Sequence, residues 1–162
     1  MLISCTNDDR KLLASCVGKK IKIVTAYKHP NVSAYSLILL QFENDRKVIL
    51  ELKSVDIVFK FEVFIVKASE RTPIEASYFG QDKFVLNDFL VKEIDVIRRV
   101  EWLEGDSGSP RHEADAGLII RSSNGTEIAL EADAFPLTFQ FRFSAVGSGG
   151  FEKSTKRLIA LS

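Results

Sequence analysis

The sequence predicts an α+β fold, mainly antiparallel β, in which a helix–strand–hairpin–strand unit is internally duplicated with pseudo-two-fold symmetry. First, residues 39–63 and 119–143 align without a gap at an offset of 80 positions. Second, apolar and polar residues alternate along many short segments rich in β-branched and aromatic residues, as they do in half-buried strands. Third, a short segment with helical spacing precedes each aligned region. Together these patterns favour two similar units that pack against each other.

The aligned segments are identical at five positions, which lie in the turn, the hairpin and the last strand. These are Asn44/Asn124, Leu50/Leu130, Glu51/Glu131, Phe59/Phe139 and Phe61/Phe141. Two copies are too few for a solenoid, which needs about three repeats to be stable. We therefore expect residues 1–162 to form a single domain of two repeats, about 6–67 and 79–146, followed by a C-terminal tail over 147–162.

The first repeat begins with a predicted helix over 8–17. Thr6 is a good capping residue, carboxylates occupy the first turn, and Gly18 ends the apolar periodicity. Alternation then predicts strands over 19–27, 35–42, 46–53 and 56–66. In the third of these strands, alternate residues from Val48 to Leu52 are apolar, so this face is expected to be buried.

The second repeat begins with a predicted helix over 82–91, because Val85, Leu86, Phe89 and Leu90 have helical spacing. The following elements are a strand, a polar loop, a hairpin and a last strand, over 92–102, 104–113, 117–132 and 137–143. For the tail, the sequence does not discriminate between a strand and a helix.

The second hairpin contains the clearest turn signal in the chain. Asn124-Gly125 stands between two apolar runs and favours a type I′ turn, in which both central residues have φ > 0. Together with Gly117-Leu118 and Phe135-Pro136, this hairpin resembles those of uncharacterised bacterial proteins that look like immunity or partner-binding modules. The resemblance implies a non-catalytic interaction protein.

The strands that contain phenylalanine are expected to form the core. If the repeats are related by a two-fold axis, Phe59 and Phe61 occupy core positions equivalent to those of Phe139 and Phe141. Apolar residues also lie on the opposite face of the first of these strands, at Val58, Phe64 and Val66. A strand that is apolar on both faces is usually covered on both sides. We therefore expect a protein partner or a homodimer there.

Composition excludes several classes of function. The chain has 162 residues, of which 46% are hydrophobic, and Lys+Arg and Asp+Glu both number 22. A chain of zero net charge has no broad attraction to nucleic acid or to anionic membranes. Two cysteines and two histidines, widely scattered, form no metal-binding spacing. No signal peptide is predicted. We expect a cytoplasmic protein without a cofactor or bound metal.

One motif points to catalysis. Gly105-Asp106-Ser107-Gly108-Ser109-Pro110 resembles the sequence around the nucleophile of chymotrypsin-like serine proteases. The resemblance implies a serine hydrolase with Ser107 as nucleophile, His29 as base and Asp56 as its orienting carboxylate. The histidine motif is out of register by one residue, however, and the hexapeptide lies where the second repeat carries about seven extra residues. We favour a surface loop.

The same loop supplies a candidate binding site. Trp102 stands at its base, and Asp106, Arg111 and His112 are polar groups beside it. A tryptophan next to a polar loop is typical of interaction hot spots. The sequence thus favours a non-catalytic cytoplasmic binding or interaction protein, with a serine hydrolase and a small-molecule carrier with an apolar inter-sheet pocket as alternatives.

Overall fold

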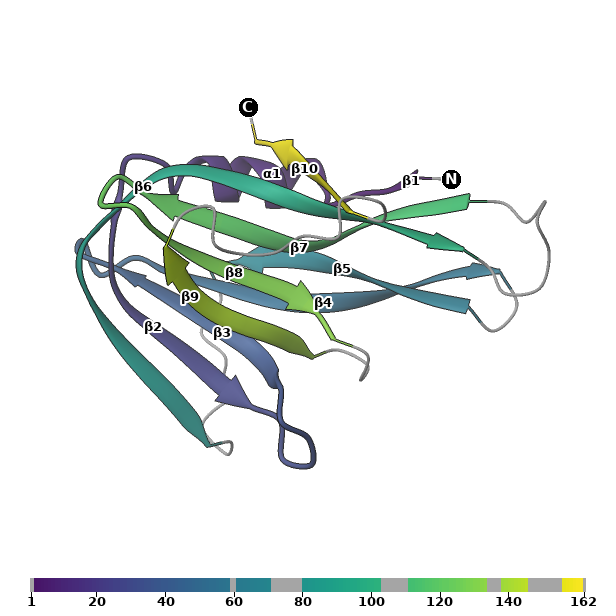
Figure 1. Ribbon diagram of the computed structural model, residues 1–162, viewed down its shortest axis with the longest axis horizontal. Helices are drawn as coiled ribbons and strands as arrows, with labels where there is room; N and C mark the ends of the chain where they lie inside the picture. The colour runs from purple at the N-terminus through teal and green to yellow at the C-terminus, as the bar shows by residue number, and fades with distance from the viewer. Residues whose placement is uncertain are drawn as a thin grey trace.

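The computed structural model describes residues 2–58, 61–70, 80–102, 111–133, 138–145 and 156–161. Within these ranges, the side chains of 55–58, 61–66, 100–102, 111–112 and 156–157 are not described. The protein is mostly β, and the described part contains a single helix (Figure 1). This helix has eight residues, so no described helix is long enough to cross a membrane.

The elements follow one another along the chain as a short strand, a helix and nine further strands. They are β1 (Leu2–Ile3), α1 (Asn7–Ala14), β2 (Lys20–Lys28), β3 (Tyr35–Phe42), β4 (Lys47–Val58), β5 (Phe61–Ser69), β6 (Gln81–Trp102), β7 (Arg111–Ser122), β8 (Thr126–Ala132), β9 (Phe139–Ala145) and β10 (Lys156–Ala160). The tail thus contributes a strand.

All ten strands belong to one hydrogen-bonded sheet, which is mixed because β1 pairs with β7 in parallel. The long strand β6 pairs with β2 along its first half and with β7 along its second half. Pairings β7–β8, β8–β9, β9–β3 and β3–β2 complete a closed circuit, from which β4 and β5 branch off β3. Figure 1 shows β2 and β3 lying across from β7 and β8, with β6 curving from one group to the other.

The predicted α+β class is wrong, because the second repeat has no helix over 82–91. Those residues form the first half of β6. The three residues between Val85 and Phe89 in β6 lie opposite the single residue between Ile23 and Ile21 in β2. Within this bulge, Asp88 has φ 55°. Inward-facing residues in a regular strand are two positions apart, but because of the bulge the next one after Leu86 is Phe89, three positions on. A bulged strand thereby imitates helical spacing.

The first predicted helix is confirmed in position, although α1 ends at Ala14 rather than at residue 17. Thr6 and Asp9 form a capping box, in which the Asp9 carboxylate accepts hydrogen bonds from the Thr6 backbone N–H at 2.9 Å and from its hydroxyl. The other Asp9 oxygen accepts from the backbone N–H of Ala68 in β5 at 3.0 Å. One buried carboxylate therefore joins the start of the helix to the outer strand of the β4–β5 branch.

The two central hairpins have the same register. In β3–β4, Ile38 pairs with Leu50, and in β7–β8, Leu118 pairs with Leu130, at the same offset of 80 positions. The side-chain oxygens of Asn44 and Asn124 both accept the backbone N–H two residues on. The predicted type I′ turn is wrong, since Gly125 has φ 87° and Asn124 is not in the positive-φ region. At the position of Gly125, the first hairpin holds Asp45 with φ 64°.

The third strands of the two hairpins are not equivalent, so the helix–strand–hairpin–strand duplication and its pseudo-two-fold symmetry are also wrong. Phe61 pairs with Val58 at the start of β5, whereas Phe141 pairs with Leu130 in the middle of β8–β9. The residue that pairs with Leu50 in β4–β5 is Ala68. Phe59 and the side chain of Phe61 lie outside the described residues, so their expected burial stays a prediction.

The core lies between the two groups of strands. Its largest fully buried side chains include Phe42, Phe89 and Phe139. The expected inward face of β4 is confirmed, because Val48 and Leu50 are fully buried. The side chains of Val58, Phe64 and Val66 are not described, so the partner inferred from them also stays a prediction.

A buried ionic cluster attaches the N-terminal segment to the sheet. Asp115 in β7 is fully buried and accepts 2.9 Å hydrogen bonds from the guanidinium groups of Arg10 in α1 and Arg98 in β6. The backbone N–H of Cys5 donates to the same carboxylate at 3.0 Å. These three donors compensate the negative charge of the Asp115 carboxylate, which would otherwise be buried without a partner.

Exchanging the turn residues of the two hairpins tests the role of the left-handed position. We expect Asp45→Gly to raise the free energy of unfolding by about 0.5–1 kcal/mol and Gly125→Asp to lower it by a similar amount, because only glycine adopts this conformation without a steric cost. A β-carbon at Gly125 would meet nothing within 4 Å, so packing does not obscure the effect. Urea denaturation measures both changes, and shifts of equal sign in the two variants would contradict the explanation.

Removing the charge of Asp115 tests the ionic cluster. We expect Asp115→Asn to lower the free energy of unfolding by about 2–4 kcal/mol, since Arg10 and Arg98 lose their buried counter-charge. The matched control is Glu93→Gln, which removes a half-exposed carboxylate beside Arg121 in the same sheet and should cost less than about 1 kcal/mol. If chemical denaturation gave equal losses of unfolding free energy for the two variants, burial would not make the Asp115 cluster more important than the Glu93–Arg121 pair.

Candidate functional site

Among the described strands, the circuit of pairings leaves an opening between the first half of β6 and β9. Pairing of β6 with β7 begins only at Val91, and β9 pairs with β3 at a single position, Tyr35 with Phe139. Along the rest of this opening, the described strands do not pair across it. A cavity of about 350 Å³ lies there, between β6, the β7–β8 turn and β9.

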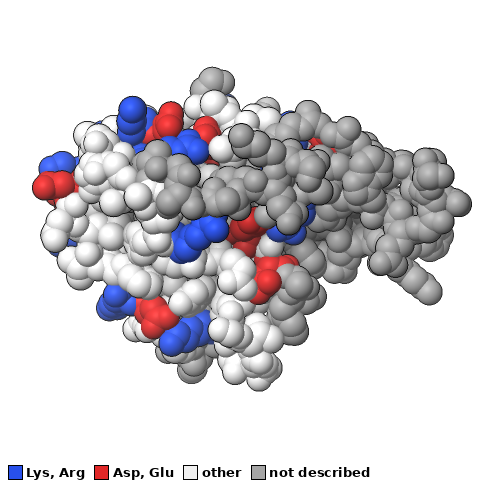
Figure 2. All heavy atoms as spheres, in the orientation of Figure 1, with Lys and Arg blue, Asp and Glu red and all other residues white. Residues whose placement is uncertain are grey.

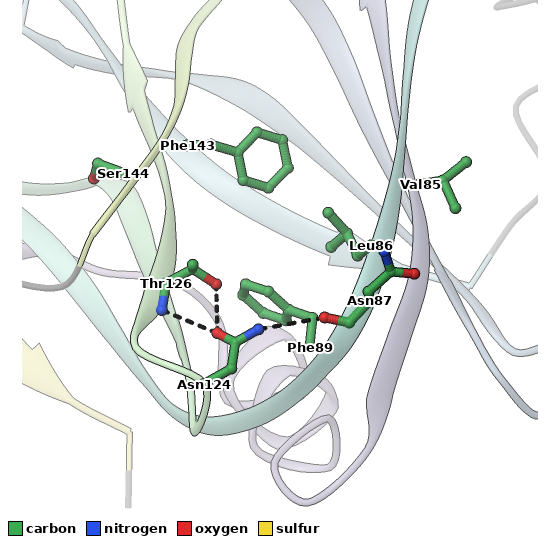
Figure 3. Close-up of a pocket in the computed structure, with 8 residues that line it drawn as sticks. All are labelled: Val85, Leu86, Asn87, Phe89, Asn124, Thr126, Phe143 and Ser144. Carbon is green, nitrogen blue, oxygen red and sulfur yellow. Dashed lines mark hydrogen bonds between the residues drawn. The ribbon is translucent and has the colours of Figure 1, made fainter.

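Three apolar side chains form the inner surface of this cavity. Figure 3 shows Leu86 and Phe89 from β6 and Phe143 from β9 pointing toward one another across it. Val85 and Ser144 also border the cavity, but their side chains point away from it, and Val85 is 73% exposed. The bulge at Asp88 creates this arrangement, because it brings Phe89 to the same face of β6 as Leu86.

An aromatic cluster continues from this apolar surface. The ring centroid of Phe143 lies 5.0 Å from that of Phe84 and 5.1 Å from that of Phe141, in edge-to-face geometry. Phe84 and Phe141 are 5.4 Å apart, and Tyr35 packs edge-on against Phe141 at 6.0 Å. Such contacts fix ring orientations. The wall of the cavity that Phe143 provides is therefore held in place by its neighbours rather than by a ligand.

The mouth of the cavity has an uncharged polar rim centred on Asn124. Its side-chain oxygen accepts hydrogen bonds from the backbone N–H of Thr126 at 3.0 Å and from the Thr126 hydroxyl at 2.6 Å. Its side-chain nitrogen donates to the backbone carbonyl of Asn87 in β6 at 3.4 Å (Figure 3). The β7–β8 turn is thus connected to β6 by this long hydrogen bond and by a shorter one, in which the Ser123 backbone N–H donates to the Leu90 carbonyl at 3.0 Å.

Charged residues gather at the far end of the aromatic cluster. The Tyr35 hydroxyl donates to Asp82 at 2.8 Å, and the Lys28 ammonium lies 3.3 Å from the same carboxylate. The hydrogen bond from Tyr35 is the main reason that the pKa of Asp82 is lowered, and it also raises the pKa of Tyr35. Figure 2 shows basic and acidic side chains interspersed on the face in view, so the described part of this face carries no broad patch of one sign.

The described lining of the cavity consists of apolar and uncharged polar side chains. The described residues contain no group of three or more His, Cys, Asp or Glu side chains that could hold a metal ion. Burial raises the pKa of the Cys5 thiol to about 12 and that of the Cys16 thiol to about 11, which makes both poor nucleophiles.

The residues of the serine-hydrolase alternative are only partly described. His29 follows β2, and its Nδ1 accepts the backbone N–H of Asn31 at 3.1 Å. Asp56 lies in β4 opposite Glu62, with its side chain outside the described set, and Ser107 lies outside the described residues. His29 adjoins the start of β6, whereas Ser107 follows the end of this strand of 22 residues. No described contact joins the three, and this alternative stays a prediction.

The candidate binding residues around Trp102 lie at one end of the β6–β7 hairpin. Trp102 pairs with Arg111, and His112 pairs with Glu101. Their side chains, and Asp106 as a whole, lie outside the described residues. The structure therefore brings three of the four backbones together, and their role in binding stays a prediction.

Sequence reasoning missed the cavity, although it noticed several of its residues. Val85, Leu86 and Phe89 were assigned to a helix, and Asn124 to a turn. In the structure, burial alternates from Asp82 to Leu86, but the residue types do not, because two polar residues are followed by three apolar ones. The sequence therefore carried no clear strand signal for this part of the site.

Comparison of the chain with protein-family models, with curated proteins and with solved structures found no match. The arrangement of the residues themselves is therefore the basis for assigning a function.

The contact between Tyr35 and Asp82 predicts a pH dependence. A carboxyl whose pKa is lowered by folding stabilises the protein above its unfolded pKa, near 3.8, and this contribution is lost as the pH falls through the folded pKa. We expect Tyr35→Phe to raise the pKa of Asp82 toward its ordinary value. A ¹³C NMR titration of the carboxyl measures the change.

The control for this titration is Tyr27→Phe, which removes a hydroxyl from the adjacent strand β2. Among the described residues, Tyr27 makes no hydrogen bond to Asp82, so the pKa of this carboxyl should not change. An unchanged pKa in Tyr35→Phe as well would show that the Lys28 ammonium, rather than the hydroxyl, is the main influence on Asp82.

Proposed function

We propose that this protein is a non-catalytic binding protein that holds a small apolar molecule in the cavity between β6 and β9. The observation that carries the proposal is the convergence of Leu86, Phe89 and Phe143 on a cavity of about 350 Å³ that opens to solvent. Sites for small molecules are typically concave and mostly apolar, with few polar groups, and have volumes of about 300–1,000 Å³. This cavity has that character.

The energetic argument rests on apolar area and on preorganisation. A ligand in the cavity removes its own apolar surface and the exposed parts of Leu86 and Phe143 from water, while Phe89 is already buried. Burial of apolar surface stabilises a complex by about 25 cal/mol per Å². The aromatic contacts of Phe143 with Phe84 and Phe141 already order this wall in the free protein. Less conformational entropy is then lost on binding.

A second candidate is a protein-binding surface on the outer face of β6. It is favoured by Val85, which is 73% exposed and pairs with the half-buried Ile23 of β2. Large apolar side chains at such exposure are common singly, so a surface of this kind needs further apolar neighbours to bind tightly. If it mediates self-association, Val85→Lys should lower the apparent mass in sedimentation equilibrium, whereas an unchanged mass would argue against a homodimer through this face.

Filling the cavity tests the proposed function. We expect the protein to bind toluene, followed by saturation-transfer NMR, and Leu86→Trp to weaken this binding at least about tenfold, because the indole occupies the space that the ligand needs. Leu158→Trp is the control: it adds the same side chain at an exposed apolar position of β10 that does not line the cavity. Toluene binding should then be unchanged.

Two outcomes would contradict the proposal. One is the absence of toluene binding by the unmodified protein at millimolar concentration. The other is equal binding by the unmodified protein and by Leu86→Trp, once circular dichroism and thermal unfolding have shown that both variants are folded.

A further inference from the structure

We infer that the ligand of this cavity is an uncharged molecule with an apolar body and one hydrogen-bond-accepting oxygen, such as a ketone, ester or ether, and that Asn124 recognises this oxygen. The inference rests on the proposed function and adds the chemical class of the ligand. It depends on which atoms of the Asn124 amide are already used and on the charges around the cavity.

The orientation of the Asn124 amide follows from its partners. The atom that faces the backbone of Thr126 receives an N–H, and only the side-chain oxygen can accept it. The same oxygen also accepts the Thr126 hydroxyl, so both of its partners are donors. The amide nitrogen must therefore be the atom on the β6 side, where it faces the carbonyl of Asn87. The rim of the cavity presents a donor.

This donor is only weakly engaged. An amide nitrogen carries two hydrogens, and the bond to the Asn87 carbonyl is 3.4 Å long, well beyond the usual 2.9–3.0 Å. A ligand oxygen at the mouth of the cavity can accept from this nitrogen at little cost to the protein. A hydrocarbon in the same place would forgo that hydrogen bond, while a second donor, such as an ammonium group, would oppose it.

Charge selects further against ions. The described lining residues carry no charge, and burying an ionised group without a partner is costly. Lys83 and Arg142, which lie near the lining residues in β6 and β9, are exposed. Arg121 in β7, three positions before Asn124, already contacts the carboxylates of Asp95, Glu93 and Glu127. It is therefore not available to neutralise an anionic ligand.

A set of four probes with a common benzene ring tests the class of ligand. We expect acetophenone to bind about fivefold more tightly than toluene, the increment of an ordinary hydrogen bond. Benzoate and benzylamine should bind at least about tenfold more weakly than acetophenone, because their charges are not compensated. Dissociation constants from NMR titration of the full chain give the ranking. Benzoate binding as tightly as acetophenone would overturn the inference.

Asn124→Asp isolates the role of the donor. This variant keeps an oxygen to accept the Thr126 N–H, so the turn is retained, but it replaces the donating nitrogen by a second, negatively charged acceptor. We expect acetophenone to lose its advantage over toluene, and benzylamine to bind several-fold more tightly than to the unmodified protein. A merely structural role of Asn124 would not reverse the preference among probes in this way.

The first hairpin provides the matched control. In Asn44→Asp, the same substitution is made in a turn with the same hydrogen bond to the residue two positions on, at a residue that does not line the cavity. The probe ranking should then be unchanged. If toluene binds but Asn124→Asp leaves the ranking unaltered, the inference about the donor fails while the binding function stands. If neither neutral probe binds, the proposed function itself fails.

Discussion

The change of partners along β6 is the constraint on which the rest of the structure depends. One strand of 22 residues pairs with β2 before Val91 and with β7 after it, so a single continuous backbone belongs to both groups of strands. The bulge at Asp88 provides the necessary bend and twist close to the point where the partners change. Without it, the two halves of β6 could not face a common core, and the circuit of pairings would not close.

The cavity is a direct result of this geometry. β2 pairs with one edge of the first half of β6, whereas β7 reaches the other edge only from Val91 onward. Among the described strands, that other edge is unpaired along the first half of β6, and it lies opposite the end of β9. Side chains on the two facing strands fill the space only in part, because Phe84, Phe141 and Phe143 pack against one another at one end and leave the other end open. The site thus arises from how the sheet closes, and the turn at Asn124 reaches across it.

Local patterns in the sequence were sufficient for the elements that depend on neighbouring residues. The capping residues around Thr6 correctly place the start of α1, and alternation along β4 correctly places Val48 and Leu50 in the core. The first half of β6 was misassigned because a bulge is stabilised by pairing with β2, which no local pattern contains. Matching phenylalanines at a fixed offset likewise gave the wrong equivalence for Phe141, since the connection that precedes each third strand sets its register.

The candidate site was beyond local reasoning for a related reason. Leu86, Asn124 and Phe143 come from three separate segments, and each of them alone has an ordinary structural explanation. Only the long-range topology brings them to one opening, and single-sequence patterns carry little information about it. The hydrogen-bond state of Asn124, on which the ligand class depends, could not have been inferred without its partners on β6.

The carboxylate of Asp9 has a consequence for how the chain assembles. A helix of eight residues is too short to persist in water by itself, so α1 depends on tertiary contacts such as those of Asp9 with the Ala68 N–H and of Arg10 with Asp115. Conversely, until the helix docks, that N–H remains on an outer strand, where another molecule could pair with it. The N-terminal segment therefore protects part of an outer strand of the sheet from pairing with another molecule.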